Sequence, residues 1–146
     1  MTTFFGRGYT SNMTNIIIAT IAQFILGALW YSPLMFGKIW MTVMEKGHVS
    51  KEELQKLQKE MMPFYGLQFV LTLWTTFHLA RLATVVGGGI SIYGLAVWLW
   101  LGFLLPLDIG SVIWANTKKK FWVKQIAVMG GMQIVGLLLA AWILSM

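Results

Sequence analysis

Four long apolar runs constrain the fold of this chain more than any other feature. They cover residues 15–36, 64–86, 90–114 and 121–145. Each is as long as the roughly 20 residues that a helix needs to cross the hydrocarbon core of a bilayer. A backbone inside hydrocarbon must satisfy its own hydrogen bonds, so we expect each run to be a helix. The sequence therefore predicts an all-α membrane protein with four transmembrane helices.

The composition agrees with helices in lipid. Only 11% of the residues are charged, against about 25% in soluble domains. The chain has no cysteine and only two histidines, which excludes disulfides, thiolate nucleophiles and cysteine- or histidine-rich metal sites. We predict no cofactor.

The first run ends in a stretch of aromatic rings, proline, glycine and lysine between Gly27 and Trp40. Proline lacks an amide hydrogen and clashes with the preceding turn, so we expect Pro33 to kink the end of the helix. Aromatic side chains gather at membrane–water interfaces. The predicted interface anchors are Trp30, Tyr31, Pro33, Trp40, Trp114 and Trp122.

A polar segment lies between the first two runs. Ser50 and Glu53 have the spacing of a capping box, which predicts that a short amphipathic helix covers residues 50–62. Pro63 is expected to separate this helix from the second span. Two positions stay open for it: the cytoplasmic membrane surface, or water as a solvated connector.

The lysines predict the orientation. Residues 38–59 carry five lysines and residues 118–124 carry four, so both loops are expected on one side of a four-span protein. The positive-inside rule then places both loops in the cytoplasm and both termini outside it, in the cell inner membrane. Residues 1–13 are predicted to be a flexible tail, and residues 14–146 a single four-helix transmembrane domain.

The basic third loop is expected to contact lipid headgroups, because lysines beside Trp122 are typical of a membrane surface. The lysines concerned are Lys118, Lys119, Lys120 and Lys124. The bilayer is thus a predicted partner, and nucleic acid is not. Glycines in the spans, Gly27 and the pair Gly130–Gly131, predict close helix approach.

The candidate functional residues are the few polar side chains in the apolar runs: His78, Arg81, Asp108, Gln23, Gln68 and Gln133. A charge in a spanning helix costs at least about 2.5 kcal/mol, so such residues usually face the bundle interior, a cavity or an interface. His78 and Arg81 lie three residues apart and share a helix face. Arg81 either reaches outer headgroups or forms a buried pair with His78.

Asp108 is the one acid outside the first loop. Three interpretations stay open: contact with Lys38 or Lys118–Lys120 at the inner surface, binding of a proton or cation in a cavity, and unpaired exposure at the interface. A direct bridge to Arg81 is not expected, because the two would differ in depth by about 12 Å at 1.5 Å per residue.

The glutamines also have two interpretations. Interhelical hydrogen bonds, worth about 0.6–2 kcal/mol each, are the ordinary one. The alternative is that Gln23, Gln68, Gln125 and Gln133 line a polar path through the membrane.

The run from Gly27 to Lys38 (GALWYSPLMFGK) resembles the first-helix signature of a bacterial family known as domain of unknown function 1761. The run from Trp98 to Pro106 is also similar to that family, and the likeness covers nearly the whole chain from Asn15 onward. The resemblance implies a small four-helix membrane protein. It brings no catalytic or binding residue with it.

These observations predict a non-enzymatic structural or interaction component that forms homo-oligomers or binds a membrane protein partner. An enzyme is not expected, since the chain holds no complete catalytic constellation. The alternative is a small transporter or channel whose polar path involves Asp108, His78 and Arg81.

Overall fold

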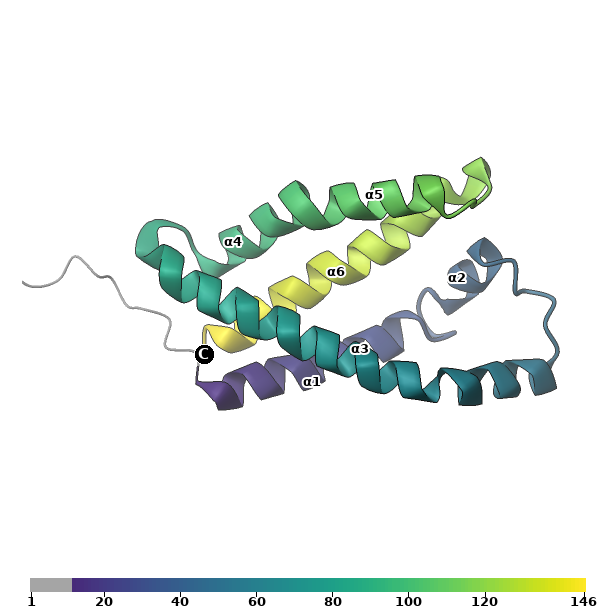
Figure 1. The fold of residues 1–146 in the computed structure, drawn as a ribbon, viewed down its shortest axis with the longest axis horizontal. Helices are drawn as coiled ribbons and strands as arrows, with labels where there is room; N and C mark the ends of the chain where they lie inside the picture. Colours follow the sequence, from purple (N-terminus) through teal and green to yellow (C-terminus); the bar gives the residue numbers. More distant parts are fainter. Residues whose placement is uncertain (1–11) are drawn as a thin grey trace, which may run out of the picture.

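The computed structural model describes residues 12–146, and helices make up most of that part of the chain (Figure 1). The helices described are α1 (Met13–Trp30), α2 (Gly37–Val43), α3 (Lys51–Val86), α4 (Ile92–Leu99), α5 (Leu105–Trp114) and α6 (Trp122–Leu144). Four helical segments are long and apolar enough to cross a membrane: Met13–Trp30, Lys51–Gly89, Ile92–Trp114 and Lys119–Leu144. The prediction of an all-α, four-span protein is confirmed, and the chain is a multi-pass membrane protein.

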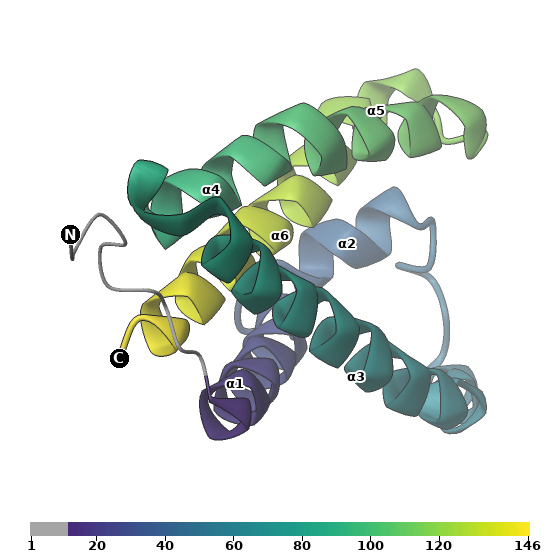
Figure 2. The ribbon, with the colours of Figure 1, turned by 60° about the vertical axis from the view of Figure 1, so that its left-hand side comes forward.

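Helix α6 lies at the centre of the bundle (Figures 1 and 2). It packs against α1, α4 and α5, and α1 also packs against α3. The residues at these crossings are small: Ala19, Ala80, Ala96, Ala140 and Ala141 are fully buried. Large side chains such as Trp74, Trp98 and Leu107 point outward instead. Small residues inside and large apolar residues outside are the packing expected for helices surrounded by lipid.

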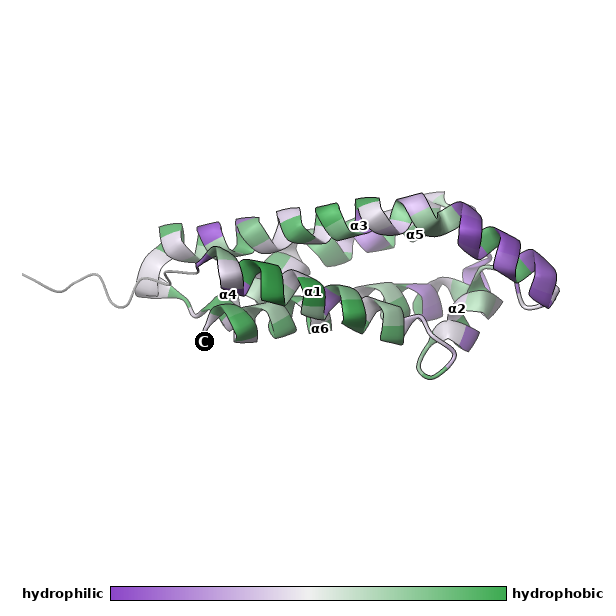
Figure 3. Cartoon of the chain, turned by 90° about the horizontal axis from the view of Figure 1, so that it is seen from below, coloured by the Kyte–Doolittle hydropathy of each residue, from purple (hydrophilic) through white to green (hydrophobic). Residues whose placement is uncertain are grey.

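The two ends of the bundle differ in polarity. The start of α1 and the C-terminus lie at one end, and α2, the start of α3 and the loop before α6 lie at the other (Figure 1). Hydrophilic residues concentrate in the first turns of α3 (Figure 3). An ion pair between Glu45 and Lys118 joins the first loop to the third. The prediction that both basic loops lie at the same end is therefore confirmed.

The first span is shorter than predicted, and Pro33 does not kink it. Helix α1 ends at Trp30, three residues before the proline. Residues 31–36 form a compact turn, closed by hydrogen bonds from the Phe36 N–H to the Trp30 carbonyl (2.9 Å) and from the Gly37 N–H to the Ser32 carbonyl (2.9 Å). A Cβ on Gly37 would lie 2.5 Å from the Tyr31 carbonyl oxygen, so this turn requires glycine there. The short helix α2 follows, and the sequence did not predict it.

The prediction that Pro63 separates two helices is wrong. Helix α3 runs without a break through Pro63, and residues 50–62 form its polar N-terminal part. The capping box is confirmed: the Ser50 hydroxyl accepts from the Glu53 N–H (3.3 Å), and the Glu53 carboxylate accepts from the Ser50 N–H (3.1 Å). A proline removes one helical hydrogen bond. The carbonyl it frees, at Lys59, lies on an exposed turn where water can bond it.

The third span contains a π-helical turn, Trp100–Leu104, in which the Leu105 N–H bonds the Trp100 carbonyl. A π turn holds one more residue than an α turn and so rotates the helix that follows. Phe103 and Leu107 consequently point outward, 54% and 69% exposed, while Asp108 is only 7% exposed. Pro106 lies in the first turn of α5, directly after this π turn.

Candidate functional site

Asp108 lies between α5 and α6 and pairs with Gln133. One carboxylate oxygen, Oδ1, accepts a hydrogen bond from Gln133 Nε2 at 3.0 Å. The other, Oδ2, is buried and has no hydrogen-bond partner in residues 12–146. Gly130 of α6 lies beside the carboxylate, where a Cβ would be 3.8 Å from Oδ2, at ordinary van der Waals distance. The interpretation that pairs Asp108 with loop lysines is wrong, because Asp108 is buried and forms no ion pair with Lys38 or Lys118–Lys120 in the part of the chain that the structure describes.

Gln23 joins α1 to α3. Its Nε2 donates to the Thr76 hydroxyl (2.6 Å) and to the Ala19 carbonyl (3.2 Å). With the Gln133–Asp108 bond, this gives two interhelical hydrogen bonds from the predicted glutamines. Gln68 differs, because its Nε2 donates to Thr72 within α3 (3.5 Å).

A cavity of about 780 Å³ lies between α1, α3 and α6. We call it the glutamine cavity. Its lining residues are Gln23, Phe24, Gly27, Ala28, Tyr31, Ser32, Pro33, Gln58, Tyr65, Gln68, Thr72, Met129, Met132 and Gln133. None of these described residues is charged. The volume is within the range of about 300–1,000 Å³ typical of small-molecule sites.

The sequence did not predict this cavity, because its walls come from three helices and the turn after α1. The available signal was the presence of glutamine in three of the apolar runs. The structure brings three of the four glutamines considered, Gln23, Gln68 and Gln133, to its wall, while Gln125 lies elsewhere on α6.

His78 and Arg81 lie elsewhere, on the outward face of α3. Both are exposed. The His78 imidazole packs against the rings of Trp74 (centroids 4.7 Å apart) and Phe77 (5.5 Å), and its Nδ1 lies 2.8 Å from the Trp74 carbonyl. Arg81 forms no ion pair with any residue that the structure describes. The structure thus gives these two residues no common site with the buried Asp108.

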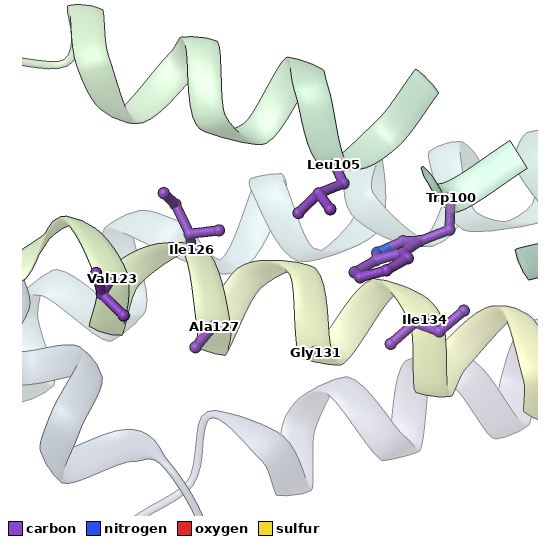
Figure 4. A pocket seen from close by; sticks show the side chains of 7 residues that line it. All are labelled: Trp100, Leu105, Val123, Ile126, Ala127, Gly131 and Ile134. Atoms are coloured by element: carbon purple, nitrogen blue, oxygen red, sulfur yellow. The ribbon is translucent and has the colours of Figure 1, made fainter. Parts of the chain in front are cut away.

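Two tryptophan side chains pack against the glycine pair of α6. Trp30 was predicted to be an interface anchor, but it is 9% exposed and its indole N–H donates to the Val128 carbonyl (3.0 Å). Trp100 donates to the Gly130 carbonyl (3.0 Å). Trp100 also borders a small apolar cavity of about 410 Å³, where its ring lies over α6 next to Gly131 (Figure 4). The close approach predicted from Gly130 and Gly131 is confirmed.

The other predicted anchors lie near the basic end of the bundle. The rings of Tyr31 and Trp40 contact each other, with centroids 5.1 Å apart. The Trp122 indole donates to the Thr117 carbonyl (2.8 Å), and Trp114 is exposed. Pro33 is exposed beside them.

The basic end itself combines one ion pair with free lysines. Lys118 donates a hydrogen bond to Glu45, and this bond together with the lysine charge lowers the pKa of the exposed Glu45 carboxyl. Lys120 lies 4.8 Å from the centre of the Phe121 ring. Lys119, Lys120 and Lys124 are exposed there. In residues 12–146, no group of three or more histidine, aspartate or glutamate side chains could hold a metal ion.

Comparison with known proteins identifies a family whose function is not known. The family described as "Protein of unknown function (DUF1761)" matches residues 14–145. No curated protein and no solved structure matches the chain. The match covers all four spans and confirms the resemblance seen in the first-helix motif.

Proposed function

The chain belongs to the DUF1761 family of proteins of unknown function, and we propose that it is a non-enzymatic membrane component that self-associates through the outward face of α3. The observation that carries this proposal is the exposed pair His78 and Arg81 on a helix that crosses the membrane. In hydrocarbon, a guanidinium group costs at least about 2.5 kcal/mol, which a partner helix can offset with polar contacts.

The neighbours of this pair support an interface. Trp74, His78, Arg81 and Val85 recur at four-, three- and four-residue spacing along α3 and are all exposed. The buried face, which includes Ala80, lies on the other side of the helix. Tryptophan and arginine are enriched among the residues that dominate binding energy. A second copy related by a two-fold axis would meet this face with the same residues.

The test is the mass of the protein in mild detergent, measured by light scattering. We expect a dimer for the natural chain and a shift toward monomer when His78→Leu and Arg81→Leu are combined. Both changes leave the buried face of α3 intact. The matched control is Leu107→Ala on the outward face of α5, which is expected to leave the mass unchanged. A monomer for the natural chain, at all protein concentrations, would sink the proposal.

We also propose that the basic end faces the cytoplasm, in the inner membrane, with both termini outside. Nine lysines of the first and third loops support this orientation, since lysine-rich loops stay on the cytoplasmic side. Lys119, Lys120 and Lys124 would contact anionic lipid headgroups there.

The chain lacks cysteine, so single introduced thiols report the orientation cleanly. Gly88 has open space around it and lies in the turn between α3 and α4. We expect a membrane-impermeant thiol reagent to label Gly88→Cys in intact cells and to leave Gly47→Cys, in the first loop, unlabelled. The opposite labelling pattern would reverse the proposed orientation.

A further inference from the structure

Three of the four amides that line the glutamine cavity, those of Gln23, Gln68 and Gln133, donate at least one N–H group to the protein. Gln23 uses both N–H groups, on Thr76 and on the Ala19 carbonyl. Gln133 donates to Asp108 at 3.0 Å, and Gln68 donates to Thr72 at 3.5 Å. The oxygen of each amide can only accept hydrogen bonds.

Two hydroxyl groups in the wall, those of Thr72 and Ser32, also donate their hydrogen to the protein. Thr72 donates its hydrogen to the Gln68 carbonyl (2.8 Å), and Ser32 donates to the Leu29 carbonyl (2.7 Å). A hydroxyl has one hydrogen and two lone pairs, so each oxygen is left as an acceptor. The oxygens of these residues therefore offer acceptors to the cavity, beside donors that remain on Tyr31, Gln58, Tyr65, Gln68 and Gln133.

The remaining walls favour a positive charge. No lysine or arginine lines the cavity among the described residues. The rings of Phe24, Tyr31 and Tyr65 are part of its wall, and aromatic faces attract ammonium groups. Behind Gln133, one hydrogen bond away, lies the buried carboxyl of Asp108. Acceptors, ring faces and this acid all select the same kind of head group.

The cavity is also long and partly apolar. It reaches along α3 from Gln58, in the polar part of the helix, to Thr72 inside the span. At 1.5 Å per residue this is about 21 Å. Met129 and Met132 form the α6 side, and methionine adapts readily to apolar guests. An occupant of this shape has a hydrocarbon portion as well as a head group.

We propose that the glutamine cavity binds an amphipathic molecule with a primary ammonium head and a hydrocarbon tail. Two sources share this chemistry: the headgroup of an aminophospholipid of the bilayer, and a free alkylamine. This binding is independent of the self-association through α3, because the cavity and the His78–Arg81 pair lie on different surfaces.

The test uses the full chain in nanodiscs of phosphatidylcholine, whose head has no N–H donor. Saturable uptake of radiolabelled dodecylamine is measured against empty nanodiscs, with dodecanoate as the probe of equal chain length and opposite charge. We expect saturable uptake of dodecylamine and at least about tenfold weaker uptake of dodecanoate, because none of the described lining residues carries a positive charge to pair with a carboxylate. Equal uptake of the two probes, or no saturable uptake of dodecylamine, would overturn the proposal.

Two variants locate the site. Gly27→Leu puts a side chain into the cavity, where the nearest atom to a Cβ is Met132 Cε at 3.4 Å. It is expected to abolish uptake, while Gly66→Leu, at a position with open space, is expected to keep it. Gln68→Leu removes an acceptor from an exposed position and is expected to weaken uptake several-fold, with Gln55→Leu as its unaffected match. Unchanged uptake in both Gly27→Leu and Gln68→Leu would refute binding in this cavity.

Nanodiscs of phosphatidylethanolamine distinguish the two sources. If this lipid abolishes dodecylamine uptake, its headgroup is the occupant, and the proposal holds for the lipid. If uptake is undiminished, the proposal holds for a free amine.

Discussion

The adjacent glycines of α6 have unlike surroundings, which makes a sharp stability test. A Cβ at Gly130 would lie 3.5 Å from Trp100 and 3.6 Å from Leu105, which is ordinary van der Waals contact. A Cβ at Gly131 would lie 3.0 Å from Cζ2 of Trp30, which is too close without a shift of the ring. The same substitution, one residue apart, should therefore stabilise at position 130 and fail to stabilise at position 131.

The magnitudes follow from two opposing terms. Alanine in place of glycine inside a helix stabilises by about 0.8–1.0 kcal/mol, so Gly130→Ala should raise the free energy of unfolding by about 1 kcal/mol. Overpacking costs about 1–3 kcal/mol. Trp30 resists displacement, because its indole bonds the Val128 carbonyl and its ring contacts Phe36, 4.5 Å away. Gly131→Ala should thus be neutral or up to about 2 kcal/mol less stable than the natural chain.

The assay is equilibrium unfolding by dodecyl sulfate in mixed micelles, followed by circular dichroism. Adding Trp30→Phe completes a double-mutant cycle. With the smaller ring in place, alanine at position 131 should stabilise as it does at Gly130. If Gly131→Ala stabilises the natural chain as much as Gly130→Ala does, then Trp30 does not pack against Gly131 and the reasoning is refuted.

Three further predictions concern other contacts. Lys118 lowers the pKa of the Glu45 carboxyl, so their ion pair joins the first and third loops at neutral pH and is lost as the pH falls through this lowered pKa. The rate of hydrogen exchange in the first loop should rise over that pH range. The variant Lys118→Met should show no such rise. Gln23→Leu should cost about 0.6 kcal/mol, and at most about 1.7, in the same unfolding assay, and no loss would mean that the bond to Thr76 is not formed. Deletion of Gly102 from the π turn should rotate α5 by about 100° and expose position 108. A cysteine introduced by Asp108→Cys should be protected from thiol reagents in the full-length chain and become reactive in the deletion variant. Continued protection would contradict the role given to the π turn.

The sequence predicted what depends on length and polarity alone. Apolar runs long enough to span a bilayer are unmistakable, so the four spans and the common end of the basic loops are correct. The effect of each proline on its helix was harder to predict, because it depends on the residues around the proline. Pro33 lies in a turn that ends the helix earlier, at Trp30, whereas Pro63 lies on an exposed turn that tolerates the lost hydrogen bond.

The positions of the site residues depend on how each helix is rotated about its axis and on which helices cross, and a single sequence specifies neither. Asp108 faces Gln133 because the π turn rotates α5, and the residues of that turn carry no pattern that distinguishes it from ordinary helix. Trp30 was taken for an interface residue because it ends an apolar run. It is buried because α6 offers Gly131 opposite it. The glycine pair was the signal, but nothing in the sequence says which helix approaches it.

The unbroken passage of α3 through Pro63 has a mechanical consequence. A helix from Lys51 to Val86 is about 54 Å long at 1.5 Å per residue, while hydrocarbon is about 30 Å thick. The part of α3 that exceeds this thickness belongs to the same continuous helix as the face bearing His78 and Arg81. A displacement of its charged first turns would therefore be passed along one unbroken helix to the turns that carry His78 and Arg81.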